Sequence, residues 1–196
     1  MWNEKQMLNY LYENLKENKI KHSLSVSETA VALAERYGAN IDKARISGLI
    51  HDCAKGMKDE ELIKAAIDYG IQLDEVYINN PSILHGLVAS IIAKDVMGIE
   101  DEDMLMAIRY HTTGRKDMSV LEKVIYIADY IEPLRAFDGV EELRSLSNIE
   151  LDLAVVKSLE NAIKYVISQN GLLHTDTIIA RNYLLSKNSR WEYEKW

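Results

Sequence analysis

Apolar residues recur along most of this chain at intervals of three and four positions, which is the spacing of one face of an α-helix. The segments from about 4 to 18 and from about 22 to 37 show this pattern clearly. No convincing run alternates between apolar and polar residues, as a half-buried strand would. The sequence therefore predicts an all-α fold of about nine to eleven helices.

Glycines mark where several of these helices are expected to end. Four of them follow a periodic segment at the position of a left-handed C-terminal cap: Gly38, Gly70, Gly98 and Gly171. Glycine takes that backbone conformation at little cost because it has no Cβ. Further helices are expected over about 42–52, 81–97, 102–111, 119–132, 149–169 and 175–185.

Three local signals set bounds of these helices. Asp42 is the expected N-cap of the helix over 42–52. Ser119 is followed three positions later by Glu122, which is the spacing of a capping box. Pro133 ends the same helix, because proline disfavours helical geometry at the residue before it. With 196 residues the chain fits one domain that buries roughly two thirds of its unfolded surface.

The charge of the chain narrows the classes of partner. A formal net charge of −8 argues against non-specific nucleic-acid binding, which depends on a basic surface. An anionic substrate would need a local positive centre, which metal ions and a few basic side chains can supply. The composition, 47% apolar and 28% charged, is otherwise that of an ordinary soluble globular protein.

The cysteine content and the length of the apolar segments indicate in which cellular compartment the protein is expected. Cys53 is the single cysteine, so an intramolecular disulfide is excluded, as is typical of a reducing cytoplasm. The first residues lack the apolar stretch of a signal peptide, and no run approaches the roughly 20 apolar residues of a membrane span. We therefore expect a soluble cytoplasmic protein without a membrane partner.

Histidine and aspartate residues in apolar surroundings are the candidate chemistry. His51 and Asp52 end an apolar helical stretch, and Asp129 lies in the apolar run 124–131. Burying such groups without partners is costly, so a carboxylate at 129 implies a cation. Mixed histidine and aspartate ligands suit iron, manganese, cobalt or zinc. The other histidines that qualify by position are His22, His85 and His111.

Each of these residues has a plainer interpretation when it is considered alone. His22 would be a solvated helix start, His85 a core histidine, and His111 a cation at a helix C-terminus. Their joint arrangement at helix ends and on apolar faces favours a metal site assembled from several helices. His174 gains no such support and is interpreted as a loop or helix-cap residue. The aromatic segment 191–196 is interpreted as a final helix turn or tail rather than a partner surface.

Four short motifs make the assignment more specific. His22, His51-Asp52 and Asp129 resemble the H…HD…D ligands of HD-domain metal-dependent phosphohydrolases. The words HDCAK at 51–55, LHG at 84–86, HTTG at 111–114 and ADYIEPLR at 128–135 are similar to the YqeK-type branch, the symmetrical bis(5′-nucleosyl)-tetraphosphatases. The resemblance extends from about residue 22 to about residue 183.

The resemblance implies a fold, a metal and a reaction. The fold would be a single HD domain over 1–196, a helical bundle with its core at about 18–135 and C-terminal helices at 149–186 packed on it. The cofactor would be one or two divalent ions, iron first, with manganese, cobalt or zinc as alternatives. The reaction would be hydrolysis of diadenosine tetraphosphate to two ADP. By position, the first ion would be held by His22, His51, Asp52 and Asp129.

The remaining candidates would act on the substrate. His85 and His111 would hold a second ion with Asp52 or contact phosphates directly. An activated water would attack one of the two central phosphorus atoms, with Asp52 also accepting a proton. Lys55 and Arg135 are the expected phosphate-binding cations, and Thr112 is a candidate hydroxyl donor to phosphate.

Three other functions stay open at this point. One is an HD nucleotidase or phosphodiesterase that acts on nucleoside monophosphates or cyclic nucleotides. Another is a nucleotide-binding regulator without turnover, and the third is a helical bundle with a structural metal. The expected partner is a small dinucleoside polyphosphate rather than a nucleic acid, and a homodimer is also left open.

Overall fold

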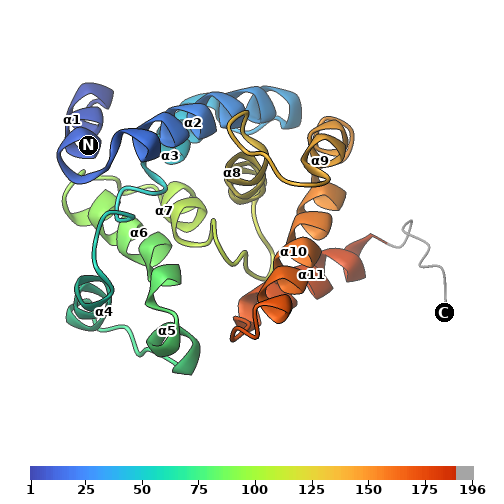
Figure 1. The fold of residues 1–196 in the computed structure, drawn as a ribbon. Coiled ribbons are helices and arrows are strands. Elements are labelled where there is room, and N and C mark those ends of the chain that lie inside the picture. Colours follow the sequence, from blue (N-terminus) through green and yellow to red (C-terminus); the bar gives the residue numbers. More distant parts are fainter. Residues whose placement is uncertain (189–196) are drawn as a thin grey trace.

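The computed structural model describes residues 1–188, and every regular element among them is helical (Figure 1). The all-α prediction is confirmed, and the aromatic segment 191–196 lies outside the described residues. The elements are α1 Glu4–Asn14, α2 Glu17–Tyr37, α3 Ile41–Ile50, α4 Asp59–Asp68, α5 Glu75–Asn79, the 3₁₀ helix η1 Pro81–Leu84, α6 His85–Asp95, α7 Glu102–Arg109, α8 Val120–Ile131, α9 Val140–Ser147, α10 Leu151–Ser168 and α11 Thr175–Lys187.

The central bundle consists of α2, α3, α6, α7 and α8. The long helix α2 packs against both α3 and α8, and α7 packs against α3, α6 and α8. Two smaller groups flank the bundle: α4 and α5 beside α6 and η1, and α9 and α10 beside α8, with α11 packed on α10 (Figure 1). The C-terminal helices therefore pack on the bundle through α8, which is also the helix that carries Asp129.

The apolar core is continuous through the bundle, and several buried histidine and carboxylate side chains gather at one place in it. Fully buried side chains such as Ile50 of α3, Ile108 of α7 and Ile127 of α8 belong to one cluster. His51, Asp52 and other histidines lie buried at the ends of these same helices. The helices thus bring polar residues to a common point through their packing. No helix in the described range 1–188 is long and apolar enough to cross a membrane.

The expected helix starts are partly right. The capping box of Ser119 and Glu122 is present at the start of α8, and α8 ends at Ile131, just before Glu132 and Pro133. The expected N-cap Asp42 is wrong, because Asn40 caps α3 by accepting a hydrogen bond from the backbone N–H of Lys43 at 2.9 Å. Both residue types are good caps, so composition alone does not choose between two positions two residues apart.

Other boundaries also differ from the expected ones. The second helix begins at Glu17 rather than near 22, so His22 lies in its second turn. Pro81 opens a short 3₁₀ turn, and α6 starts only at His85. Gly38, Gly70 and Gly98 have the left-handed conformation, with φ of 71°, 82° and 71°. Gly171 does not, because the preceding Asn170 takes that conformation with φ of 53°.

Candidate metal centre

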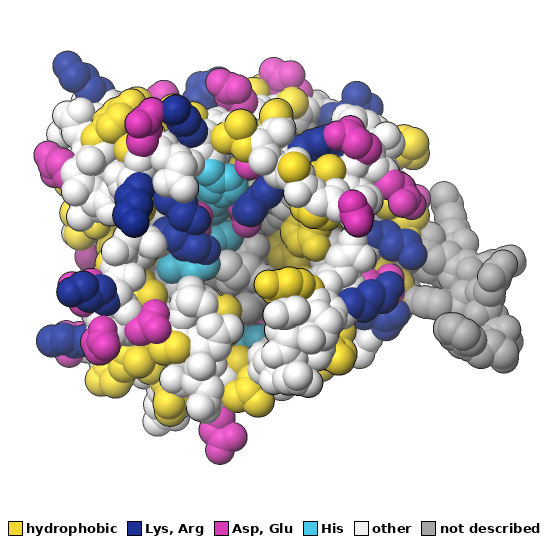
Figure 2. Space-filling view, in the orientation of Figure 1, with side chains coloured by type: hydrophobic (Ala, Val, Ile, Leu, Met, Phe, Trp, Pro, Cys, Tyr) yellow, Lys and Arg dark blue, Asp and Glu magenta, His cyan; other side chains and the backbone are white. Residues whose placement is uncertain are grey.

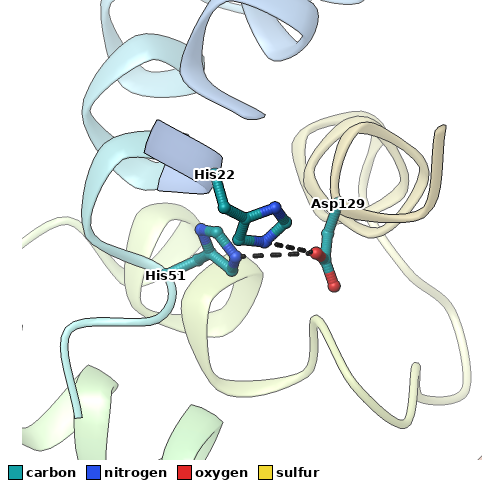
Figure 3. A group of neighbouring side chains, drawn as sticks. All are labelled: His22, His51 and Asp129. Carbon is teal, nitrogen blue, oxygen red and sulfur yellow. Dashed lines mark ion pairs between the residues drawn. The ribbon is translucent and has the colours of Figure 1, made fainter. Parts of the chain in front are cut away.

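Two histidines and two aspartates from three parts of the bundle meet at one point. His22 comes from α2, His51 and Asp52 follow α3, and Asp129 comes from α8. His22 Nε2 lies 2.9 Å from Asp129 Oδ1 and 3.8 Å from Asp52 Oδ2. His51 Nε2 lies 3.7 Å from Asp129 Oδ1 and 3.8 Å from Asp52 Oδ2. Figure 3 shows both imidazoles directed at the Asp129 carboxylate.

A second group adjoins the first through Asp52. His85 Nε2 lies 3.0 Å from Asp52 Oδ1 and 3.0 Å from His111 Nε2. The ring of His111 also stands edge-on to that of His51, with centroids 4.8 Å apart. Lys55 brings a positive charge to the same place, its Nζ 2.9 Å from His85 Nε2 and 3.6 Å from Asp52 Oδ1. The structure thus brings together all the histidines and aspartates singled out as ligands.

The orientation of three of these rings follows from helix-end geometry. Each carbonyl near a helix end can accept more than one hydrogen bond, and a ring that folds back can donate to it. In each case the Nδ1–H donates to the carbonyl three residues earlier: His51 to Gly48, His85 to Ser82 and His111 to Ile108. A carbonyl only accepts, so Nδ1 carries the proton and the Nε2 lone pair faces the centre.

Glu132 does the same for His22 and was not among the residues predicted from the sequence. Its Oε1 accepts a hydrogen bond from His22 Nδ1 at 3.0 Å, and its Oε2 accepts one from the backbone N–H of Leu134 at 2.6 Å. Glu132 is only 1% exposed although it sits at a helix end. A carboxylate one residue before a proline, after an apolar run, was the available sequence signal.

Unpaired polar atoms show that the centre suits a cation. His22 Nε2, His51 Nε2 and Asp52 Oδ1 are buried and have no hydrogen-bond partner despite their short contacts. Burying a polar atom without a partner costs free energy. One positive ion that contacts several such atoms offsets this cost for all of them. Nitrogen and oxygen donors of this kind suit iron, manganese, cobalt or zinc. The residues present therefore fit a divalent metal.

The charges within the centre influence one another strongly. Burial would raise the pKa of Asp52, but His51, His111 and His85 outweigh it and hold that pKa well below its usual value. Burial likewise opposes ionisation of Asp129, whose pKa is nevertheless held well below the usual value by His22, His51 and Arg135. Both carboxylates are therefore ionised and available to a cation.

The pKa values of two of the buried histidines, His51 and His111, are shifted in opposite directions. Burial opposes the charged form of His51, yet Asp52 and Asp129 outweigh it and raise its pKa. Burial lowers the pKa of His111 to about 4, and the nearby His51 and His85 act in the same direction. His111 is therefore a neutral imidazole at pH 7, with its Nε2 lone pair free to accept.

A cavity of about 530 Å³ opens beside the centre, and Figure 2 shows histidines at the floor of a hollow with apolar side chains next to them. Two expected substrate contacts, Thr112 and Arg135, lie in its lining. Arg135 donates to Asp129 Oδ1 at 2.6 Å and to the backbone carbonyl of Asp129 at 2.9 Å. His174 lies outside it as the N-cap of α11, which confirms its interpretation as a cap.

The same cavity has aromatic walls that sequence reasoning did not single out. Its lining consists of His111, Thr112, Tyr126, Asp129, Tyr130, Arg135, Phe137, Ala162 and Tyr165. His111 and Asp129 belong to the centre, so cavity and centre are continuous. The sequence signal was weak, because aromatic residues at helical spacing are most simply interpreted as core.

A model of the HD domain family matches residues 20–134, a range that includes every histidine and aspartate of the centre. The chain belongs to the HD-domain family. A solved structure from Clostridium acetobutylicum, described as a predicted HD superfamily hydrolase involved in NAD metabolism, has the same fold. It superposes with a TM-score of 0.93 and 51% sequence identity, over 95% of this chain and 99% of that one. The expected HD fold is therefore confirmed.

Curated relatives identify the branch of this HD family. The chain is 40% identical over 184 residues to the symmetrical bis(5′-nucleosyl)-tetraphosphatase of Bacillus subtilis, which covers 94% of this chain and 98% of that enzyme. It is 38% identical to the enzyme of the same name from Halalkalibacterium halodurans, over 93% and 97% of the two chains. The resemblance to this branch is confirmed.

Proposed function

We propose that this HD protein hydrolyses diadenosine tetraphosphate symmetrically, giving two molecules of ADP. The observation that carries the proposal is the convergence of unpaired, buried nitrogen and oxygen atoms of His22, His51 and Asp52 at the floor of an open cavity. The near full-length similarity to enzymes named for this activity supports the choice of substrate. The protein acts in the cytoplasm on this small molecule, without a nucleic-acid or membrane partner.

The metal ligands are His22, His51, Asp52 and Asp129. Iron is the preferred ion, and manganese, cobalt and zinc are the alternatives. When bound there, such an ion supplies Lewis-acid activation of water and charge neutralisation at phosphate. The two histidine ligands are preorganised. The Nδ1 of His22 is hydrogen-bonded to Glu132, and the Nδ1 of His51 is hydrogen-bonded to the backbone carbonyl of Gly48. Asp52 also accepts a proton during the reaction, since its second oxygen, Oδ1, has no hydrogen-bond partner.

One ion rather than two is sufficient for this centre. The acceptor atoms of His85 and Asp52 already have the Lys55 ammonium beside them as a positive charge. Lys55, His85 and His111 then face the substrate phosphates rather than a second ion. Metal analysis of the purified protein is expected to give one tightly held ion per chain, and two would contradict this assignment.

Two further side chains position the polyphosphate. The planar guanidinium of Arg135 has five donors, more than its contacts with Asp129 use, and the remainder suit phosphate oxygens. The hydroxyl of Thr112 lies in the same cavity lining and donates to phosphate or ribose. Since ADP is a fair leaving group, positioning and charge neutralisation account for most of the protein's task.

The test uses protein loaded anaerobically with ferrous iron and mixed with diadenosine tetraphosphate, with the products separated by anion-exchange chromatography. ADP as sole product supports the proposal, whereas AMP with ATP would contradict symmetrical cleavage. NAD is assayed in parallel, because the Clostridium acetobutylicum relative is described as involved in NAD metabolism. Hydrolysis of NAD or of nucleoside monophosphates alone would favour the rival phosphohydrolase functions.

A further inference from the structure

Four aromatic residues line the cavity beside the metal centre, and together they are called its aromatic wall. Tyr126 and Tyr130 come from α8, Phe137 from the segment after α8, and Tyr165 from α10. The rings of Tyr126 and Tyr130 lie nearly parallel, at 15° with centroids 6.5 Å apart. Phe137 stands edge-on to Tyr130 at 5.3 Å. Tyr126, Tyr130 and Phe137 are therefore a connected aromatic cluster, and Tyr165 lines the same cavity.

Two of these four rings are exposed to solvent, whereas Tyr126 is only 3% exposed and belongs to the core. Tyr165 is 67% exposed and Phe137 is 38% exposed, although each lines a concave site. Exposed apolar surface gathered in one hollow marks a binding site more often than scattered single residues do. A cavity of about 530 Å³ has the size typical of small-ligand sites. Tyr165 and Phe137 are thus available to a flat ligand of modest size.

The cavity lining combines polar and aromatic groups. Arg135, His111 and Asp129 belong to the metal centre or contact it, and the aromatic rings line the same cavity. Among the described residues of the lining, the only carboxylate is Asp129, which already accepts from Arg135. A ligand that suits both kinds of lining group has a flat apolar part and a negative part, which is the composition of a nucleoside diphosphate group.

We infer that this aromatic wall binds one nucleobase of the substrate by stacking, with the attached phosphates directed toward Arg135 and the metal centre. The inference rests on the proposed function for the identity of the nucleotide. The described lining contains no side-chain amide that would read the edge of a base. Stacking tolerates any base because every base has a π-face, so adenine and guanine bind with similar affinity.

Binding of the product half of the substrate tests the site without turnover. Titration calorimetry on the metal-loaded full chain measures the Kd of ADP, GDP and pyrophosphate, the last of which has phosphates but no base. Tyr165→Ala and Phe137→Ala are each expected to weaken ADP and GDP binding roughly 5-fold to 100-fold, the range for loss of one aromatic–base stack. Pyrophosphate binding and metal content stay at the parent values.

Tyr12→Ala is the matched control, because Tyr12 is 63% exposed on α1 and outside the cavity lining. Its ADP affinity is expected to equal that of the parent. Unchanged ADP binding in both cavity variants would overturn the inference. Equal weakening of ADP and pyrophosphate would overturn it as well, since that result assigns the rings to the phosphates or to folding.

The steady-state kinetics separate this inference from the proposed function. If the parent hydrolyses diadenosine tetraphosphate, both cavity variants are expected to raise KM far more than they lower kcat. Hydrolysis with an unchanged KM would keep the proposed function and reject the base site. Absent hydrolysis together with ring-dependent ADP binding would keep the base site and reject the proposed function.

Discussion

The metal centre and the aromatic wall of the cavity adjoin one another but are built in opposite ways. In the centre, His51 is fully buried and its Nδ1 is held by a backbone carbonyl. On the wall, Tyr165 is 67% exposed, and no hydrogen bond to its side chain is found among the described residues. The comparison indicates that the groups proposed to hold the metal are preformed, whereas the exposed rings proposed to contact the base are left open for a ligand to cover.

The largest expected effect comes from removing the aspartate that both halves of the centre share. Asp52 lies within 4 Å of His22, His51, His85, His111 and Lys55. Asp52→Ala is expected to abolish activity and tightly bound metal together, because its carboxylate is the charge that the ion pairs with. Metal analysis and the ADP assay measure the two effects. Asp68→Ala, at an exposed position on α4, is the control, and full activity in Asp52→Ala would contradict the metal hypothesis.

A smaller effect is expected where a histidine faces the substrate rather than the first ion. His111→Ala is predicted to lower kcat about 100-fold, the scale for loss of one group that stabilises developing charge. Iron content stays at the parent value, because the four proposed ligands are untouched. His174→Ala removes another buried histidine, the N-cap of α11, and is expected to change stability but not kcat. Normal kinetics in His111→Ala would leave His111 with a structural role only.

Sequence reasoning located the centre because its residues conflict with their surroundings. Asp129 lies between apolar neighbours on α8, and His51 with Asp52 ends an apolar helix, so each required a partner. The all-α fold followed in the same way from a single helical period. These features depend only on residues that are close in the sequence, so they can be recognised without a structure.

The aromatic wall could not be found in this way. Tyr130 and Tyr165 are 35 positions apart, and only the packing of α10 on α8 brings them to one cavity. Aromatic residues on α8 also fit the apolar period of a core-facing helix. The group that holds the ring of His22 was equally hidden, because its Nδ1 partner is Glu132, 110 positions away.

A substitution at Glu132 tests how much the fixed orientation of the His22 ring contributes to metal binding. Glu132→Gln keeps the size of the side chain but replaces the carboxylate that holds His22 Nδ1, so metal affinity is expected to fall roughly 10-fold. Competition with a chelator measures this affinity, and kcat at saturating metal stays close to the parent value. Glu122→Gln is the matched control, because Glu122 is equally buried at the other end of α8 and bonds to Arg115 instead. Equal metal affinity in both variants would show that Glu132 only closes the end of the helix.

The smallest effect is expected from substitutions that add side-chain volume to each of the two regions. A Cβ added to Gly86 would lie 2.8 Å from the carbonyl oxygen of Arg109 and 3.2 Å from the ring of His111. Gly86→Ala is therefore expected to lower the free energy of unfolding, since overpacking costs about 1–3 kcal/mol and the better helix preference of alanine returns less than that. Denaturant titration measures the loss.

The matching change on the cavity side is Ala162→Leu on α10, where the side chain lines open space. Leucine and alanine are both good helix formers, so its free energy of unfolding is expected to stay within about 0.5 kcal/mol of the parent. Its added volume instead narrows the cavity and weakens ADP binding. Gly86→Ala and Ala162→Leu thus separate stability from ligand binding: one methyl group disturbs the closed centre, while a larger side chain beside the wall disturbs only the ligand. Equal losses of stability in the two variants would mean that the cavity is part of the packed core and that the contrast between the two regions is wrong.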